Sequence, residues 1–388
     1  MNIKKVLREG LLMEVATMKV DMPIPDNVMV LSRIFDENGY ELYVVGGAVR
    51  DFLLDKPIKD YDVVTNALPD QIEDILSKAG VRTIPTGKQF GIINAFVEGE
   101  EFEIATFRID SKTGDGRRPD SVSFTDMKTD ANRRDLTINA LYYNIQTQEV
   151  IDYVGGVEDI KNGIVRTVGD PAERFEEDKL RILRAIRFAA RTGNGLDPKI
   201  EAFLSSGYDL SEIASERIRD EFLKSIKSAI SVEYLMQTYL KYDLFKWTFP
   251  RLEINTNFID DNDHILVLAH LLIKNDLDSL GKKLNALNYT INEIRDIRFL
   301  AGIPKFLVPK LAYSLKKNQA NTTVSELDIL KIGELHGVNK NLLDAFNKFT
   351  LTVSGNEVMH KYNVTGPEVG QMITDLETLN FMNLLNNK

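Results

Sequence analysis

The sequence has no cysteine and only four histidines among its 388 residues. The lack of cysteine excludes disulfide bonds and thiolate zinc sites, and it is typical of proteins in a reducing cytosol, so we expect a cytoplasmic location. The four histidines include no pair with the close spacing of a zinc or catalytic site. Because His264 and His270 are six residues apart in an apolar run, we expect them to pack in a core rather than to bind a ligand.

Long apolar runs are also absent. No segment approaches about 18 consecutive apolar residues, so we expect neither a membrane-spanning helix nor a membrane partner. Segment 1–21 lacks the uninterrupted apolar core and the small-residue cleavage site of a signal peptide. What remains is an ordinary globular composition, 43% hydrophobic and 27% charged, whose length suggests two or three domains.

An excess of positive charge is lacking too, because the formal net charge is −10. Nucleic-acid binding requires local positive charge rather than a basic protein overall. The basic residues of this chain do cluster, as the motifs below show, so the acidic balance does not exclude a nucleic-acid partner.

The chain changes character near residue 155. Before it, short runs rich in Val, Ile and Phe predict strands, and two segments between them predict helices. After it, long helical patterns continue to the C-terminus, with breaks expected at glycines and at prolines such as Pro250, Pro304 and Pro309. The predicted strands are 42–45, 60–65, 91–97 and 102–108, and the predicted helices between them are 48–54 and 69–79.

The segment from Gly46 to Asp62 reads GGAVRDFLLDKPIKDYD and is the most informative part of the chain. In an extended strand, Asp60 and Asp62 point to one side, about 7 Å apart along the chain. Two such carboxylates repel each other unless a cation lies between them, and Mg²⁺ is a cation that prefers oxygen ligands. The paired glycine lets backbone N–H groups approach a phosphate. The pattern therefore predicts a metal-dependent nucleotidyl-transfer site, whereas a lone Asp-x-Asp would be a solvated turn.

A third carboxylate ligand is expected at Glu103. It lies in segment 102–108, where alternation places it on one face with Ala105 and Phe107. If this strand adjoins Asp60 and Asp62, Glu103 faces the same ion. The alternative, an exposed strand glutamate, stays open.

A loop and a basic turn follow. Segment 110–120 is rich in glycine, charge and proline, so it predicts either a mobile lid beside an active site or a solvated connection. Downstream, Arg133 and Arg134 suit phosphate groups and Asp135 suits a ribose hydroxyl. The alternative for all three is surface charge at a helix end.

A helix is predicted from Asp170, which precedes a proline at the first helical position, to about residue 193. Within it, Asp178 and Arg181 are three residues apart and share a face. An Asp accepts hydrogen bonds and an Arg donates them, so the pair matches the pairing edges of cytosine and adenine and refuses guanine and uracil. The alternative is an i, i+3 surface ion pair. The other basic residues of this helix form a stripe that suits a polyanion: Arg184, Arg187 and Arg191.

Five motifs in this order resemble those of class II CCA-adding enzymes (tRNA nucleotidyltransferases), in the superfamily that includes bacterial poly(A) polymerases. The resemblance covers about segment 40–225. The catalytic motif falls on Gly46, Gly47, Arg50, Asp51, Asp60 and Asp62. The ribose-selecting motif falls on Arg133, Arg134, Asp135, Asn139 and Ala140. The hinge motif falls on 152–159, the base-selecting motif on 177–181 and the last motif on 215–224.

The resemblance implies an α/β nucleotidyltransferase head of the polymerase-β type, followed by an all-helical neck, body and tail. The implied parts are an N-terminal extension at 1–22, the head at 23–155, the neck at 156–225, the body at 226–310 and the tail, expected to bind tRNA, at 311–388. It also implies two Mg²⁺ ions held by Asp60, Asp62 and Glu103, and a flexible loop, used in switching from C to A addition, at Asp115, Gly116, Arg117 and Arg118.

The implied function is template-independent addition of C, C and A to tRNA 3′ ends from CTP and ATP, with release of pyrophosphate and no obligate protein partner. Gly46, Gly47 and Arg50 are expected to contact the triphosphate, and Asp178 and Arg181 to read the base. One alternative is a poly(A) polymerase or a partial enzyme that adds only CC or only A. Another is a catalytically silent RNA-binding homologue, against which the intact Asp60 and Asp62 argue.

Overall fold

The computed structural model describes residues 15–110 and 121–386, and it divides the chain into two compact units, Met1–Ile213 and Ala214–Lys388. The boundary lies inside the segment predicted as the neck, and the finer division of the helical part stays a prediction. In the described ranges, no helix is long and apolar enough to cross a membrane.

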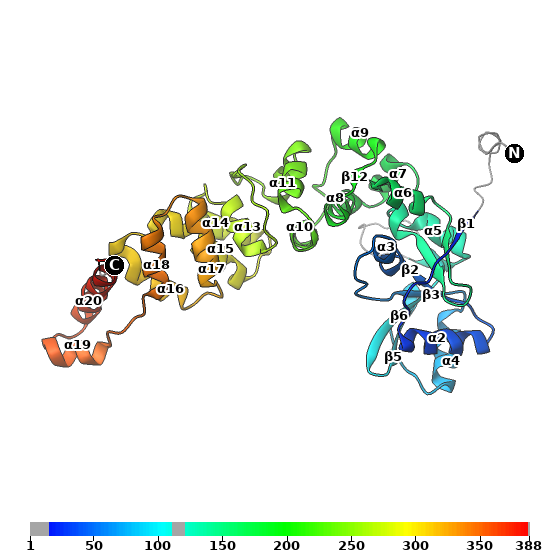
Figure 1. Cartoon of the computed structure of the whole chain (residues 1–388), viewed down its shortest axis with the longest axis horizontal. Helices are drawn as coiled ribbons and strands as arrows, with labels where there is room; N and C mark the ends of the chain where they lie inside the picture. The colour runs from blue at the N-terminus through cyan, green and yellow to red at the C-terminus, as the bar shows by residue number, and fades with distance from the viewer. Residues whose placement is uncertain (1–14, 111–120, 387–388) are drawn as a thin grey trace. The chain divides into compact units, whose positions relative to one another are not determined.

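The first unit is built on one eight-stranded sheet (Figure 1). All neighbouring strands run antiparallel except β3 and β6, which run parallel. The order across the sheet is β1 (Ala16–Lys19), β10 (Glu149–Asp152), β9 (Leu141–Asn144), β2 (Leu42–Val45), β3 (Val63–Thr65), β6 (Glu100–Thr106), β5 (Ile92–Val97) and β4 (Arg82–Gly87).

Helices cover this sheet and connect its strands. On one side α2 (Asp26–Glu37) packs against β2, and α4 (Pro69–Lys78) packs against β4 and β5 (Figure 1). Helix α3 (Gly47–Leu53) follows β2 directly, and α5 (Met127–Arg133) packs against β7 (Arg108–Asp110), which pairs with β8 (Val122–Phe124).

The centre of the sheet carries the core that supports the site. Residues from β2, β3 and β9 meet residues from α5 in one buried cluster, because alternate residues of each strand point to the same face. The cluster consists of Tyr43, Val45, Val64, Phe107, Met127, Ala131 and Tyr142, with Ala105 packed against it. Ala105 and Phe107 thus contact the same core, as the predicted alternation requires.

The connection to the helical part contains α6 (Gly156–Asn162), α7 (Pro171–Glu177), α8 (Leu180–Thr192) and α9 (Pro198–Ser206), with the two-residue strands β11 (Ile164–Val165) and β12 (Gly195–Leu196). The predicted loss of strands after residue 155 is confirmed in the described residues, since only these two short strands follow.

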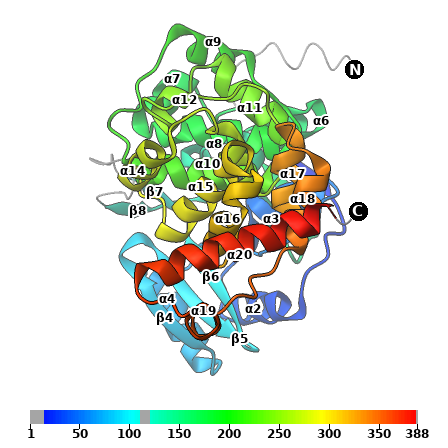
Figure 2. The same cartoon turned by 90° about the vertical axis from the view of Figure 1, so that its left-hand side faces the viewer.

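The described residues of the second unit form helices joined by loops, with no strand among them. Asp263, Asp276 and Thr290 cap helix starts with their side-chain oxygens, as sequence preferences lead one to expect. Figure 2 shows the long C-terminal helix in red. The helices are α10 (Ser215–Ser228), α11 (Val232–Lys241), α12 (Phe245–Thr248), α13 (His264–Leu271), α14 (Leu277–Ala286), α15 (Ile291–Phe306), α16 (Ala312–Gln319), α17 (Glu326–Leu335), α18 (Lys340–Lys348), α19 (Gly355–Tyr362) and α20 (Pro367–Asn386).

One prediction for this unit is wrong. Pro304 does not break a helix, because it lies in the last turn of α15, which continues to Phe306. His270 is buried, as expected for a packing residue, and its Nδ1 lies 3.0 Å from Nε2 of His336, although 66 residues separate them in the chain. In the described ranges, no third histidine or carboxylate joins them in a group that could hold a metal ion.

Candidate active site

The acidic pair lies directly before β3. The predicted strand 60–65 begins only at Val63, but the carbonyl of Asp62 accepts a hydrogen bond from the Val45 N–H at 3.0 Å, so the chain is already paired with β2 at Asp62. The side chains of Asp60 and Asp62 are both exposed. Partial loss of water against the surrounding protein raises the pKa of the Asp62 carboxyl, and the negative charge of Asp60 raises it further. A bound cation would relieve both effects.

Glu103 lies on the strand next to Asp62, and its role as a third ligand stays a prediction. Strands β3 and β6 pair in parallel with Val63 opposite Ile104, so the preceding residues, Asp62 and Glu103, lie next to each other at the edge of that ladder. Glu103 is exposed. Across the described residues, no three acidic or histidine side chains converge tightly enough to enclose an ion. The donor set, carboxylate oxygens alone, still suits a hard divalent cation completed by water and substrate phosphate.

The glycine turn connects β2 to α3. Gly46 has a φ of 70°, which favours glycine, and its N–H donates to the carbonyl of Leu141 at 3.0 Å. The N–H of Gly46 is thus occupied within the protein. The next N–H groups, from Gly47 onward, belong to the first turn of α3, where a helix lacks internal acceptors and favours an anion.

Arg50 is not presented to solvent. It is 3% exposed, and its guanidinium donates to Asp51 Oδ1 at 2.7 Å and to Asn139 Oδ1 at 2.5 Å. It also lies over the ring of Phe188 at 4.9 Å. The structure therefore places Arg50 between the glycine turn and the ribose-selecting motif, and its contact with a triphosphate stays a prediction.

Arg133 and Arg134 share one buried carboxylate. Both guanidinium groups pair with Asp130, at 2.7 Å and 3.1 Å respectively. No motif in the sequence marked Asp130; its position three and four residues before the two arginines on α5 was the only available signal.

Asp135 is bound to the arginine stripe of α8. Its Oδ2 accepts from Nη2 of Arg184 at 2.6 Å, and its Oδ1 accepts from the amide of Asn139 at 3.3 Å. Burial alone would raise the pKa of the Asp135 carboxyl, but the charge of Arg184 and these hydrogen bonds outweigh it and lower the pKa. Asp135 is thus ionised and positioned by Arg184, a residue predicted only to bind a polyanion.

The base-selecting segment differs from the prediction. A single helix was expected from Asp170 to residue 193, but the chain leaves the helix at Asp178, whose φ is −151°. Helices α7 and α8 are separate, so Asp178 and Arg181 do not share a helix face. Asp178 Oδ1 accepts from the N–H of Leu180 at 3.0 Å, which satisfies a donor at the start of α8.

Arg181 pairs with a different acid from the one considered in the sequence. Its Nη1 donates to Glu177 Oε2 at 2.6 Å across the break. The alternative considered for the sequence, an i, i+3 ion pair between Asp178 and Arg181, is therefore wrong: Arg181 pairs with Glu177. Each side chain is partly buried, and base reading by the two stays a prediction.

The remaining arginines of α8 face the head. Arg191 pairs with Asp51 Oδ2 at 2.6 Å, and Arg187, mostly buried, lies over the Phe188 ring at 4.4 Å. Arg191 on Asp51 and Arg184 on Asp135 connect α8 to the two motifs that carry Gly46 and Asp135, whereas the contact of Arg187 lies within α8. The predicted basic stripe is thus largely matched by acids of the same unit, and its contact with nucleotide or RNA stays a prediction.

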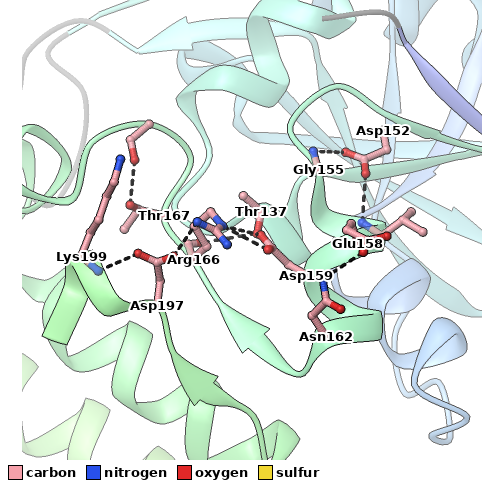
Figure 3. A network of polar contacts seen from close by, with 12 residues as sticks. Thr137, Asp152, Gly155, Glu158, Asp159, Asn162, Arg166, Thr167, Asp197 and Lys199 are labelled. Carbon is pink, nitrogen blue, oxygen red and sulfur yellow. Dashed lines mark hydrogen bonds and ion pairs between the residues drawn. The ribbon is translucent and has the colours of Figure 1, made fainter. Parts of the chain in front are cut away.

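The hinge motif forms a separate polar network (Figure 3). Asp152 Oδ1 accepts from the N–H groups of Val154 and Gly155, each at 2.9 Å. Asp159 accepts from the hydroxyl of Thr137 at 2.6 Å and from Arg166 at 3.0 Å. The guanidinium of Arg166 also reaches Asp197, the N-cap of α9, at 2.5 Å. One arginine therefore links the hinge, the ribose-selecting motif and α9.

Substitution of Gly156 by alanine should disturb this hinge. A Cβ there would lie 2.8 Å from the carbonyl carbon of Thr137 and 3.0 Å from a methyl of Leu141, so backbone must move. We expect a loss of about 2 kcal/mol in the free energy of unfolding, measured by urea denaturation. Gly370→Ala on α20, where a Cβ meets nothing within 4 Å, is the control and should be neutral or slightly stabilising. Equal stability of Gly156→Ala and wild type would contradict the close packing.

The comparisons with known proteins now decide the family. Residues 42–166 match the model of the poly A polymerase head domain. The CCA-adding enzyme of Staphylococcus aureus (strain bovine RF122 / ET3-1) is 32% identical over 371 residues, which cover 90% of this chain and 91% of that protein. The chain belongs to the CCA-adding enzyme family. With the CCA-adding enzyme of Lactobacillus helveticus (strain DPC 4571) it is 42% identical over 211 residues, 53% of this chain and 51% of that protein.

Solved CCA-adding enzymes show the same fold. The Bacillus stearothermophilus CCA-adding enzyme in complex with CTP matches with a TM-score of 0.70 at 23% identity, over 93% of this chain and 92% of that one. The Thermotoga maritima CCA-adding enzyme complexed with tRNA matches with a TM-score of 0.69 at 22% identity, over 95% and 97%. The polymerase-β-like head followed by helices, predicted from the sequence, is confirmed.

Membership of the CCA-adding enzyme family makes this chain a nucleotidyltransferase, an enzyme class that uses divalent metal ions. Asp115, Gly116, Arg117 and Arg118, the predicted flexible loop, lie outside the described residues.

Proposed function

We propose that this protein is a template-independent tRNA nucleotidyltransferase that adds C, C and A to tRNA 3′ ends from CTP and ATP and releases pyrophosphate. The observation that carries the proposal is the 32% identity with a CCA-adding enzyme across nine tenths of both chains, with Asp60 and Asp62 both intact. The tRNA complex of the Thermotoga maritima relative and the CTP complex of the Bacillus stearothermophilus relative support the same substrates. Because tRNA, CTP and ATP are found in the cytoplasm, we propose that the protein acts there.

Asp60 and Asp62, with Glu103 on the neighbouring strand, would hold two Mg²⁺ ions. When bound, these ions supply positive charge for the α-phosphate and for the attacking RNA 3′-hydroxyl. The strand register supports this assignment, because it places Asp62 next to Glu103 and leaves Asp60 two residues away on the same segment.

The protein's own groups then bind and orient the nucleotide. The first turn of α3, from Gly47, would meet the triphosphate with N–H groups and a positive dipole end. Asp135, ionised and held by Arg184, would accept a hydrogen bond from a ribose hydroxyl. Asp178 and Arg181, at the break between α7 and α8, would read the pairing edge of the base, so protein groups choose C and A in place of a template.

Extension of defined tRNA tests the proposal. We expect a tRNA that ends at the discriminator base to gain CCA and then stop when CTP and ATP are both supplied, with products resolved on a sequencing gel using radiolabelled nucleotides. A tRNA that ends in CC should gain a single A from ATP alone. Elongation with CTP alone should stop after two residues.

The same gel separates the alternatives. The matched head model is described for poly(A) polymerases, so a long adenylate ladder would assign the chain to that activity instead. A product that halts after CC, or that accepts only A, would indicate a partial enzyme. Absence of any extension would contradict nucleotidyl transfer and favour a silent RNA-binding homologue.

A further inference from the structure

Asp130 is a fully buried carboxylate in the head, with 0% of its surface exposed. It lies on α5, one helical turn before Arg133 and Arg134, and belongs to none of the motifs noted in the sequence. Burying a charge costs free energy unless the charged group is paired and hydrogen-bonded. A buried carboxylate such as Asp130 therefore needs compensating partners.

Both oxygens of Asp130 are fully used. Oδ1 accepts from Nε of Arg133 at 2.8 Å and from the N–H of Arg108 at 3.2 Å. Oδ2 accepts from Nη2 of Arg134 at 3.1 Å and from the hydroxyl of Tyr142 at 2.7 Å. Burial alone would raise the pKa of the Asp130 carboxyl, but the charges of Arg134 and Arg133 outweigh it and lower the pKa. Asp130 therefore anchors two arginines at once, and we call it the anchor of this cluster.

Asp130 fixes the position of the Arg134 guanidinium. Its Nη1 donates to the carbonyl of Asn139 at 3.4 Å, and a Cβ built on Gly46 would lie 3.5 Å from the same Nη1. Its plane also lies over the Tyr142 ring at 5.3 Å. Arg134 is thus held on three sides at the glycine turn, directly before the first turn of α3.

This turn is adjacent to the acidic pair. Gly46 follows Val45, whose N–H donates to the carbonyl of Asp62. Arg134 therefore lies at the turn that connects the neighbour of Asp62 in the sheet to the start of α3. A guanidinium binds phosphate best when its planar fork is already oriented, because less side-chain freedom is lost on binding.

We propose that Asp130 is a positioning residue for nucleotide binding: it holds Arg134 at the Gly46 turn in the orientation that receives the phosphates of CTP and ATP. This inference rests on the proposed function for the identity of the nucleotide. Asp130 itself touches no substrate and acts through Arg134, with Tyr142 as a second support.

The test is equilibrium binding of CTP and ATP to Asp130→Asn, measured by calorimetry with Mg²⁺ and without RNA. The amide keeps the shape but loses the charge and part of the acceptor capacity, so we expect binding about tenfold weaker. In tRNA extension, KM for both nucleotides should rise by the same factor while kcat changes little. A purely structural defect would instead reduce the active fraction and leave KM unchanged.

Two further variants show whether Asp130 acts through Arg134. Arg134→Gln should weaken nucleotide binding by itself, and the double variant Asp130→Asn/Arg134→Gln should be no weaker than Arg134→Gln alone. Additive losses in the double variant would overturn the proposal, as would wild-type affinity in Asp130→Asn. Should Asp130→Asn fail to fold, Tyr142→Phe replaces it: it removes one support, and unchanged CTP affinity there overturns the proposal.

The matched control is Asp296→Asn in the second unit. Asp296 is 3% exposed and accepts from the hydroxyl and the N–H of Thr323, so it is also a buried acid in a hydrogen-bonded cluster. It should lose stability without losing CTP affinity; an equal loss of affinity would contradict a specific role for Asp130. Wild-type protein that binds CTP but adds nothing to tRNA would contradict the proposed function and leave this inference standing.

Discussion

Replacing Asp60 or Asp62 by alanine is expected to reduce CTP and ATP incorporation by at least about 10³-fold, because each change removes one carboxylate from a site that depends on metal-bound charge. The raised pKa of Asp62 is caused first by lost solvation and then by the charge of Asp60. Asp60→Ala removes that repulsion, so the folded state should be as stable as wild type or slightly more stable. Single-turnover extension of labelled tRNA and thermal unfolding measure the two effects.

Asp74→Ala provides the control for this experiment. Asp74 is an exposed acid of α4 that pairs with Lys78 at 2.6 Å, so its loss should leave both activity and stability nearly unchanged. Wild-type turnover in either Asp60→Ala or Asp62→Ala would remove the acidic pair from the mechanism. Glu103→Ala, one strand away, should show a defect of the same kind if it completes the ligand set.

The second large effect is expected from exchanging the two residues that would read the base. The variant Asp178→Arg/Arg181→Asp exchanges the hydrogen-bond donor and acceptor. We therefore expect kcat/KM to rise for UTP and GTP and to fall for CTP and ATP. We expect the ratio of kcat/KM between UTP and CTP to shift by at least about 10²-fold, since mismatched pairs leave buried polar groups unsatisfied. Rates with each of the four nucleotides measure this shift.

Glu177→Gln is the matched control for the exchange. It weakens the partner of Arg181 at the break between α7 and α8 without changing the donor–acceptor order toward a base. Its overall rates should fall modestly while CTP and ATP stay preferred. Continued preference for CTP and ATP in the exchanged variant would refute base reading by Asp178 and Arg181.

Local pattern was sufficient for much of the head. β2 runs from Leu42 to Val45 as predicted, and α4 begins at Pro69 as predicted, because a buried apolar run and a proline at the first helical position are local signals. The break at Asp178 was missed because residues 171–192 read as continuous helix formers. One tertiary contact, Arg184 on Asp135, and local contacts across the break, such as Arg181 on Glu177, accompany it.

The same limit applies to the site. The candidate acids and the glycine turn were found from local patterns: two aspartates two residues apart, a paired glycine after an apolar run and a glutamate in an alternating segment. The sequence did not indicate Asp130. Its proposed role depends on a hydrogen bond from Tyr142, which lies on another element, and on its contact with Arg134, and both form only in the folded protein. Likewise, the pairing of His270 with His336 requires helices far apart in the chain to meet.

The sequence by itself determined the two-part α/β and helical organisation and the acidic pair, because periodicity and short motifs act over a few residues, and its motifs already resembled those of the family. Tertiary structure alone decided that Asp62 and Glu103 are neighbours, that Arg50 is buried and that the α8 arginines bind acids of the head. These outcomes depend on strand register and side-chain pairing between distant segments, which arise only when the chain packs and desolvates its charges together.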